Sequence, residues 1–179
     1  PIEISNRELI SKFFLACSFA NKGYTSYIGA KKQVWDIIKF TKNAIYFDKG
    51  YHKGVSESLY KNIKNNNGYV VSLDEENGVD LKKNNTLDQR FPADVFNYFD
   101  LTLLWGSFQL DYLIKNRNIC HSNIFSFGHT RFELLKSKYQ KLYKKDVTLI
   151  KKNYNDYILI NTSFGFGNNI LGEDFVNRN

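Results

Sequence analysis

The chain has 179 residues, of which 42% are hydrophobic and 24% are charged, a balance that excludes an intrinsically disordered protein. Its formal net charge of +7 is compatible with a nucleic acid, a membrane surface or a small anionic substrate as partner. The lysines are spread along the whole sequence, so a solvated basic surface is the simplest interpretation, and we expect no nucleic-acid partner.

No stretch of the sequence approaches the roughly 20 apolar residues that a membrane-spanning helix needs. Residues 13–20 resemble the core of a signal peptide, but no small-residue cleavage pattern follows them, and the acidic Glu3 and Glu8 precede them. These features favour a cytoplasmic location. The cysteines Cys17 and Cys120 form no metal or redox spacing, and Cys17 is predicted to be a buried thiol because its neighbours are apolar.

Apolar residues occur either at helical spacing or in short runs, and the two patterns alternate along the chain. Residues 9–20 are predicted to form the first helix, with Gly23 as its C-terminal cap. Further helices are expected at residues 34–40, 56–63, 92–98, 107–115 and 131–143. Residues 1–4 resemble the end of a strand, and further strands are expected at residues 24–28, 44–47, 68–73, 101–105, 123–127 and 157–160.

Short apolar strands that alternate with helices indicate right-handed βαβ units and a parallel sheet. Strands that are apolar on both faces need helices over both sides of the sheet. We therefore predict an α/β fold with a Rossmann-like parallel sheet covered by helices, whose strand order the pattern does not determine. Residues 1–127 are assigned to this domain, the polar residues 128–156 to a crossover or linker, and residues 157–179 to the start of a second domain.

Ligands of parallel α/β sheets gather at the carboxyl ends of the strands, so the residues that follow each predicted strand are candidate site residues. The best candidates for catalysis are Asp74, Glu75 and Glu76, which follow the strand predicted at residues 68–73. Adjacent carboxylates repel one another, which raises a pKa and can create a general base. Glu3 is a candidate for the same role. The alternative for the acidic triplet is a solvated loop or a helix cap.

A second set of polar residues is predicted to bind substrate. Gly128 precedes a predicted helix that begins at Arg131, where backbone N–H groups and the guanidinium would suit a phosphate or a carboxylate. The loop after residues 157–160 is rich in hydrogen-bond donors and glycine, although it contains no complete phosphate-binding motif. The predicted substrate-binding residues are Arg7, Glu8, Gly128, Arg131, Asn161, Thr162, Ser163 and Asn168.

Other kinds of site have less support in the sequence. The three histidines, His52, His121 and His129, have no metal-ligand spacing, so we expect no metal and no bound cofactor in this portion. A GxSxG motif is absent, which leaves Ser/His/Asp catalysis without support. The aromatic residues, 16% of the chain, fall on the periods of core positions, which favours packing over base stacking.

Five segments occur in an order that resembles a known family: Asn6-Arg7-Glu8-Leu9, residues 23–29, residues 72–78, residues 128–133 and residues 157–165. Together they resemble the bacterial surface carbohydrate biosynthesis proteins, which are distantly similar to the bacterial Kdo transferases, and they span nearly the whole chain. The family typically has Gly-Asn-Pro-Arg-Phe-Asp where this chain has Gly128-His129-Thr130-Arg131-Phe132-Glu133. The resemblance therefore implies a role for the backbone at this helix start, and it does not extend to the side chains of His129 and Thr130, which differ from those of the family.

The resemblance implies the N-terminal half of a GT-B glycosyltransferase, in which the first domain binds mainly the acceptor and the second mainly the donor. The implied reaction moves a sugar from a nucleotide sugar to a surface polysaccharide or lipopolysaccharide acceptor. Because acceptors in the family are lipid-linked, the resemblance is also compatible with peripheral contact between the protein and the cytoplasmic face of the membrane. We expect this fragment alone to be inactive. The alternative is a non-catalytic module of the same fold that binds a carbohydrate or a nucleotide sugar.

Overall fold

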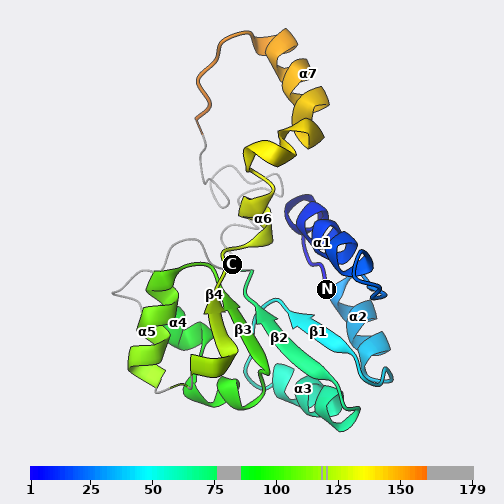
Figure 1. The fold of residues 1–179 in the computed structure, drawn as a ribbon, viewed down its shortest axis with the longest axis vertical. Coiled ribbons are helices and arrows are strands. Elements are labelled where there is room, and N and C mark those ends of the chain that lie inside the picture. Colours follow the sequence, from blue (N-terminus) through cyan, green and yellow to red (C-terminus); the bar gives the residue numbers. More distant parts are fainter. Residues whose placement is uncertain (76–85, 118, 120, 161–179) are drawn as a thin grey trace, which may run out of the picture. The chain divides into compact units, whose positions relative to one another are not determined.

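The computed structural model describes residues 1–75, 86–117, 119 and 121–160. The chain divides into two compact units, of which Pro1–Ser137 is the first and the second begins at Lys138. The first unit contains a sheet of four parallel strands in the order β1-β2-β3-β4 (Figure 1). The strands are β1 (Ile45–Asp48), β2 (Tyr69–Leu73), β3 (Leu101–Leu104) and β4 (Ile124–Ser126). The prediction of an α/β fold with a Rossmann-like parallel sheet is confirmed.

Each strand leads through at least one helix to its neighbour in the sheet. The connecting elements are α3 (Ser56–Asn65), α4 (Thr86–Arg90), the 3-10 helix η2 (Ala93–Asn97), α5 (Ser107–Arg117) and the 3-10 helix η3 (His121–Asn123). α3 packs on β2, and α5 packs on β3 and β4. The core lies between these elements and includes the fully buried side chains of Tyr60, Ile63, Val70, Leu104 and Leu113.

Helix α1 (Ser5–Ala20) has its polar side turned inward. Its buried residues are Glu8, Ser11 and Lys12, whereas Ile10 and Phe13 are 59% and 61% exposed. The polar residues face the polar carboxyl ends of the strands, described below, which explains why charged groups are buried in a largely apolar helix. The prediction of a buried thiol at Cys17 is wrong, because this side chain is exposed.

Two predicted strands are not formed, and the strand end predicted at residues 1–4 is only an isolated bridge at Ile2. Residues 24–28, which lie between α1 and α2 (Lys31–Ile38), are exposed and outside any strand, and residues 157–160 are likewise exposed. Both segments have the apolar and β-branched residues of strands, but a strand is stable only when it pairs with another. Near the first segment, Ile2 forms an isolated parallel bridge with Ala30.

The predicted helix at residues 131–143 is divided into α6 (Thr130–Glu133) and the 3-10 helix η4 (Ser137–Tyr143). The predicted linker is helical in part, since it contains α7 (Lys144–Tyr154). The first compact unit includes α6, which packs against α1, and ends at Ser137. The domain boundary after residue 127 and the start of a second domain at residue 157 stay predictions.

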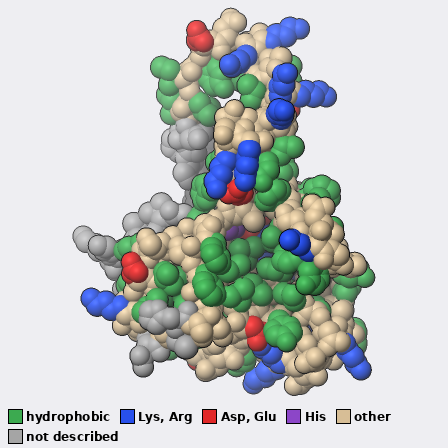
Figure 2. All heavy atoms as spheres, viewed as in Figure 1, with side chains coloured by type: hydrophobic (Ala, Val, Ile, Leu, Met, Phe, Trp, Pro, Cys, Tyr) green, Lys and Arg blue, Asp and Glu red, His purple; other side chains and the backbone are tan. Residues whose placement is uncertain are grey.

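Many of the basic side chains on the face in view lie over one element. Figure 2 shows Lys and Arg side chains gathered over α7, with others at separate places on the described residues and hydrophobic side chains between them. None of the helices in the described part of the chain is long and apolar enough to cross a membrane.

Candidate functional site

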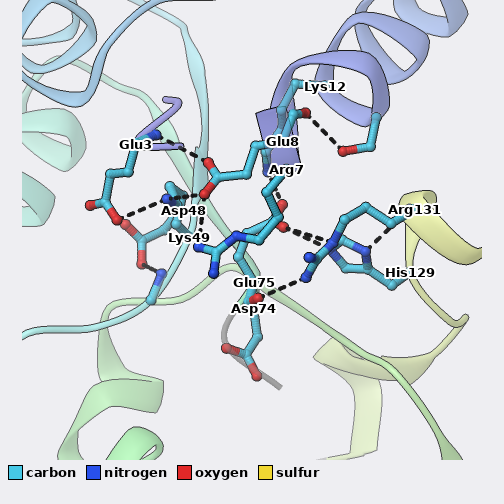
Figure 3. A network of polar contacts seen from close by, with 12 residues as sticks. Glu3, Arg7, Glu8, Lys12, Asp48, Lys49, Asp74, Glu75, His129 and Arg131 are labelled. Carbon is cyan, nitrogen blue, oxygen red and sulfur yellow. Dashed lines mark hydrogen bonds and ion pairs between the residues drawn. The ribbon is translucent and has the colours of Figure 1, made fainter. Parts of the chain in front are cut away.

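The carboxyl ends of all four strands contribute to one polar region, which is completed by α1 and by the start of α6. Figure 3 shows side chains of α1 reaching toward residues that follow β1 and β2, and side chains at the start of α6 reaching toward the same place. This is the edge of a parallel sheet at which ligands usually bind. The residues of this polar network are Glu3, Arg7, Glu8, Lys12, Asp48, Lys49, Asp74, Glu75, His129 and Arg131.

Lys49, directly after β1, holds two carboxylates. Its Nζ donates to Oε1 of Glu8 at 2.8 Å and to Oε2 of Glu3 at 2.9 Å. Hydrogen bonds from Lys31 and then Lys49 lower the pKa of Glu3 to about 2. Burial alone would raise the pKa of Glu8, but hydrogen bonds from Lys49, from the Glu3 amide and from Arg7 outweigh it and lower this pKa to about 2. Both carboxylates are therefore ionised near neutral pH.

The predicted substrate-binding pair Arg7 and Glu8 is largely engaged within the protein. Glu8 is fully buried, and its carboxylate accepts from Arg7 at 3.0 Å and from the backbone N–H of Glu3 at 3.1 Å. The side chain of Arg7 is about one-third exposed. A direct contact with a ligand is thus open to Arg7, whereas Glu8 positions its neighbours.

Glu75 lies fully buried among cationic groups. Its Oε1 pairs with Lys12 of α1, and its Oε2 lies 3.2 Å from Nε2 of His129 and 3.7 Å from Nε of Arg131. Burial would raise the pKa of Glu75, but the hydrogen bond from His129 and the positive charge of Lys12 outweigh burial and lower it. The expectation of a raised pKa from adjacent carboxylates is therefore wrong for Glu75, because its nearest charged neighbours are positive.

The start of α6 uses its donors inside the protein. Gly128, with a φ of +83°, turns the chain from β4 toward α6 in a conformation that other residues rarely adopt. Nδ1 of His129 accepts from the backbone N–H of Arg131 at 3.2 Å, so the proton of the neutral imidazole is on Nε2, which faces Glu75. The Arg131 guanidinium donates to the backbone oxygen of Glu75 at 2.9 Å. The two donors predicted to bind an anion are thus already engaged.

Trp105, which follows β3, ties the acidic loop to α6. Its indole N–H donates to the backbone oxygen of Asp74 at 2.6 Å. Its ring packs on the imidazole of His129 with 4.6 Å between centroids, and the guanidinium of Arg131 lies 5.4 Å from the Trp105 centroid. These contacts hold the backbone of the acidic loop in one place, as a rigid site requires.

Asp74 and Glu3 both line a pocket of about 110 Å³ beside the polar network. Asp74 is buried and forms an ion pair with Arg90 of α4. The side chain of Glu3 is 38% exposed, so it reaches solvent as well as the pocket. The pocket is therefore the place at which two predicted catalytic residues could meet a ligand, whereas Glu75 does not line it. Its lining includes Glu3, Lys49, Asp74, Arg90, Phe91 and Phe99.

Sequence reasoning missed five residues of this region for different reasons. Asp48 and Lys49 follow a predicted strand, so the rule that located Asp74 would have located them, as it would Trp105. Burial raises the pKa of Asp48, although the Gly50 N–H donates to its carboxylate at 3.0 Å. Lys12 could have been singled out because it is a charged residue within a largely apolar helix. Arg90 could not be located in this way, because α4 lies in a segment for which the sequence predicts neither a helix nor a strand.

Five predicted site residues lie outside the described residues: Glu76, Asn161, Thr162, Ser163 and Asn168. In the described part of the chain, no three His, Cys, Asp or Glu side chains are grouped in a way that could hold a metal ion. No family model, no curated protein and no solved structure matches the chain.

Proposed function

We propose that this chain is the acceptor-side part of a GT-B glycosyltransferase that moves a sugar from a nucleotide-activated donor to a surface polysaccharide or lipopolysaccharide. The proposal begins from the family resemblance in the sequence. The observation that supports it is the pocket of about 110 Å³ lined by Asp74 and Glu3 at the carboxyl ends of parallel strands. The proposal includes a cytoplasmic location with peripheral membrane contact, and a nucleotide sugar as donor substrate rather than a bound cofactor.

The chemistry of the pocket suits one sugar unit. Carboxylates accept hydrogen bonds from sugar hydroxyls, and the cationic Lys49 and Arg90 donate to hydroxyl oxygens. Phe91 and Phe99 offer apolar surface to the C–H groups of a sugar ring. The pocket is smaller than the roughly 300–1,000 Å³ of sites for drug-sized ligands. It therefore takes the reacting end of an acceptor rather than several sugars.

The two carboxylates of the pocket suit different roles. Glu3, with a pKa of about 2, is a weak base that would orient a hydroxyl and stabilise positive charge on the donor sugar carbon. Asp74 would take the proton of the acceptor hydroxyl as its oxygen bonds to that carbon and the nucleotide leaves with the bonding electrons. Glu75, which is buried and paired with Lys12 and His129, is assigned a positioning role.

Isosteric variants of the complete protein test this proposal. Asp74→Asn and Glu3→Gln remove a charge and keep the shape, so each should lower transfer from a labelled nucleotide sugar at least about 100-fold if the group acts as a base or stabilises charge. Assays below the melting temperature of each variant separate catalysis from stability. Asp36→Asn, at an exposed carboxylate of α2, is the matched control and should keep full activity. Near wild-type turnover of both pocket variants would refute the assignment.

A non-catalytic sugar-binding module is the second candidate, because both pocket carboxylates are neutralised by cations. Glu3 pairs with Lys31 and Lys49, and Asp74 pairs with Arg90, as in a site built to hold a polar ligand. This module would bind the sugar, and Asp74→Asn would weaken binding, while the complete protein would transfer no label. Binding without turnover therefore selects this candidate over the enzyme.

A further inference from the structure

A second, larger cavity lies between α1, α2, residues 24–28 and β1, along the same face of α1 that carries Lys12. Its volume is about 390 Å³, and it is separate in position from the pocket that contains Asp74. The parts of its wall that α1 and α2 contribute are mainly apolar. The residues that carry this character are Leu15, Ala16 and Phe19 of α1 and Val34, Ile37 and Ile38 of α2.

One side of this cavity is a strand edge with free hydrogen-bonding capacity. Within the described residues, β1 pairs with β2 and with no other strand. The carbonyl of Ala44 accepts from the N–H of Tyr69 at 2.8 Å, so this residue faces β2. Because backbone groups alternate along a strand, those of Ile45 and Phe47 face the opposite edge, where both residues line the cavity.

The opposite side of the cavity is formed by residues 24–28, which have a strand-like sequence but lie outside any strand. Immediately after them, Ile2 pairs in parallel with Ala30. The N–H of Ile2 donates to Gly29 at 2.8 Å, and the N–H of Lys31 donates to Ile2 at 3.1 Å. Pro1 also lines the cavity. The backbone therefore runs from the bridge at Ile2 back to Pro1 at the wall of the cavity.

We propose that this cavity is a strand-binding slot, which takes one extended apolar segment in line with Ile2 and parallel to β1. Such a segment would hydrogen-bond to the free edge at Ile45 and Phe47, and on its other side to residues 24–28, which would then become a strand. Its side chains would fill the apolar space between α1 and α2, as central strands of parallel sheets do. Adding a strand to an exposed sheet edge is a common mode of peptide recognition. This inference is independent of the proposed function.

The test joins an extended segment to Pro1 of the full chain and measures amide hydrogen exchange. An extension of about five residues, the usual length of a strand, with the sequence Val-Ile-Val-Ile-Val should enter the slot. Exchange at the amides of Ile45 and Phe47 should slow at least about tenfold, since these N–H groups would gain partners. The matched control is an extension of equal length with the sequence Gly-Ser-Asp-Gly-Ser, which has low strand propensity and no apolar side chains.

A pair of variants on α1 locates the effect. Ala16→Trp fills the slot and should abolish the protection, whereas Ala20→Trp, at an exposed position on the same helix outside the slot, should leave it unchanged. Unchanged exchange at Ile45 and Phe47 in the extended chain, or equal protection by the control extension, would refute a strand-binding slot. Protection of these amides by decanoate but not by the Val-Ile-Val-Ile-Val extension would also refute it, in favour of a pocket for an apolar small molecule.

Discussion

At the scale of single residues, the site keeps carboxylates ionised where little water reaches them. Glu8 and Glu75 are both fully buried, and both have a lowered pKa because cationic or N–H donors surround them. A buried carboxylate with several donors is a rigid anchor for its neighbours and a weak proton acceptor. Glu75 also lies outside the pocket of about 110 Å³ that Asp74 lines, so the proposed function assigns the reacting role to Asp74 and a positioning role to Glu75.

The acid sensitivity of the protein should depend on Glu8. Its folded pKa of about 2 lies below the ordinary value of roughly 4.3, so its stabilising effect is complete above that ordinary value and is lost as the pH falls toward 2. Glu8→Gln should lower the free energy of unfolding at pH 7 by about 1–3 kcal/mol. It should also flatten the loss of stability between pH 4 and pH 2, as measured by urea unfolding. Asp36→Asn, at an exposed pair with Lys39, is the control; an equal flattening there would contradict this role of Glu8.

At the scale of elements, α1 joins the sheet through charges rather than through an apolar stripe. Lys12 and Glu75 form a buried ion pair between α1 and the loop after β2. Replacing Lys12 by Met or Glu75 by Gln leaves the other charge buried, so each single variant should lose about 3–5 kcal/mol of stability. A double-mutant cycle should give a coupling energy of about 1–3 kcal/mol between the two side chains.

The matched cycle uses Lys39 and Asp36, an exposed ion pair on α2 with 3.3 Å between its charged atoms. That pair should couple by less than about 0.5 kcal/mol because solvent screens it. Equal coupling energies in the two cycles would show that burial does not strengthen the pair between Lys12 and Glu75. Chemical denaturation of the single and double variants supplies both values.

The sheet could be predicted from the sequence because each strand is a short apolar run bounded by polar residues. All four described strands overlap a predicted one, and their carboxyl ends gave the positions of Asp74, Glu75 and Arg131. Residues 24–28 carry the same pattern and form no strand, since pairing depends on a neighbour that a local pattern does not specify. The partners of Glu75 were not predictable for the same reason: Lys12 and His129 meet it only through the tertiary fold.

At the scale of the whole molecule, the described core and the polar network lie within the unit Pro1–Ser137. A chain that ends at Ser137 should therefore unfold cooperatively, with a melting temperature within about 5 °C of that of the full chain. A chain that ends at Gly128 lacks His129 and Arg131, so Lys12 is the only one left of the three side chains that contact the Glu75 carboxylate. It should lose at least about 3 kcal/mol, which corresponds to a melting temperature lower by roughly 10 °C.

Calorimetry of both truncated chains measures these values. A large loss of stability in the chain that ends at Ser137 would contradict the independence of the first unit. A chain that ends at Gly128 with an unchanged melting temperature would show that α6 adds little to the network.

The simple strand order has a consequence for biosynthesis. Because each strand pairs with the one made just before it, the sheet can grow while the nascent chain leaves the ribosome. The charged partners of α1 are made in the same order: Lys49, which binds Glu8, follows β1, and Glu75, which pairs with Lys12, follows β2. His129, which contacts Glu75, follows β4. At about 5–20 residues per second, Lys12 is made roughly 6–24 s before His129. During translation the buried charges of α1 would therefore gain their partners in steps, Glu8 after β1 and Lys12 after β2, and Glu75 would gain its contact with His129 last.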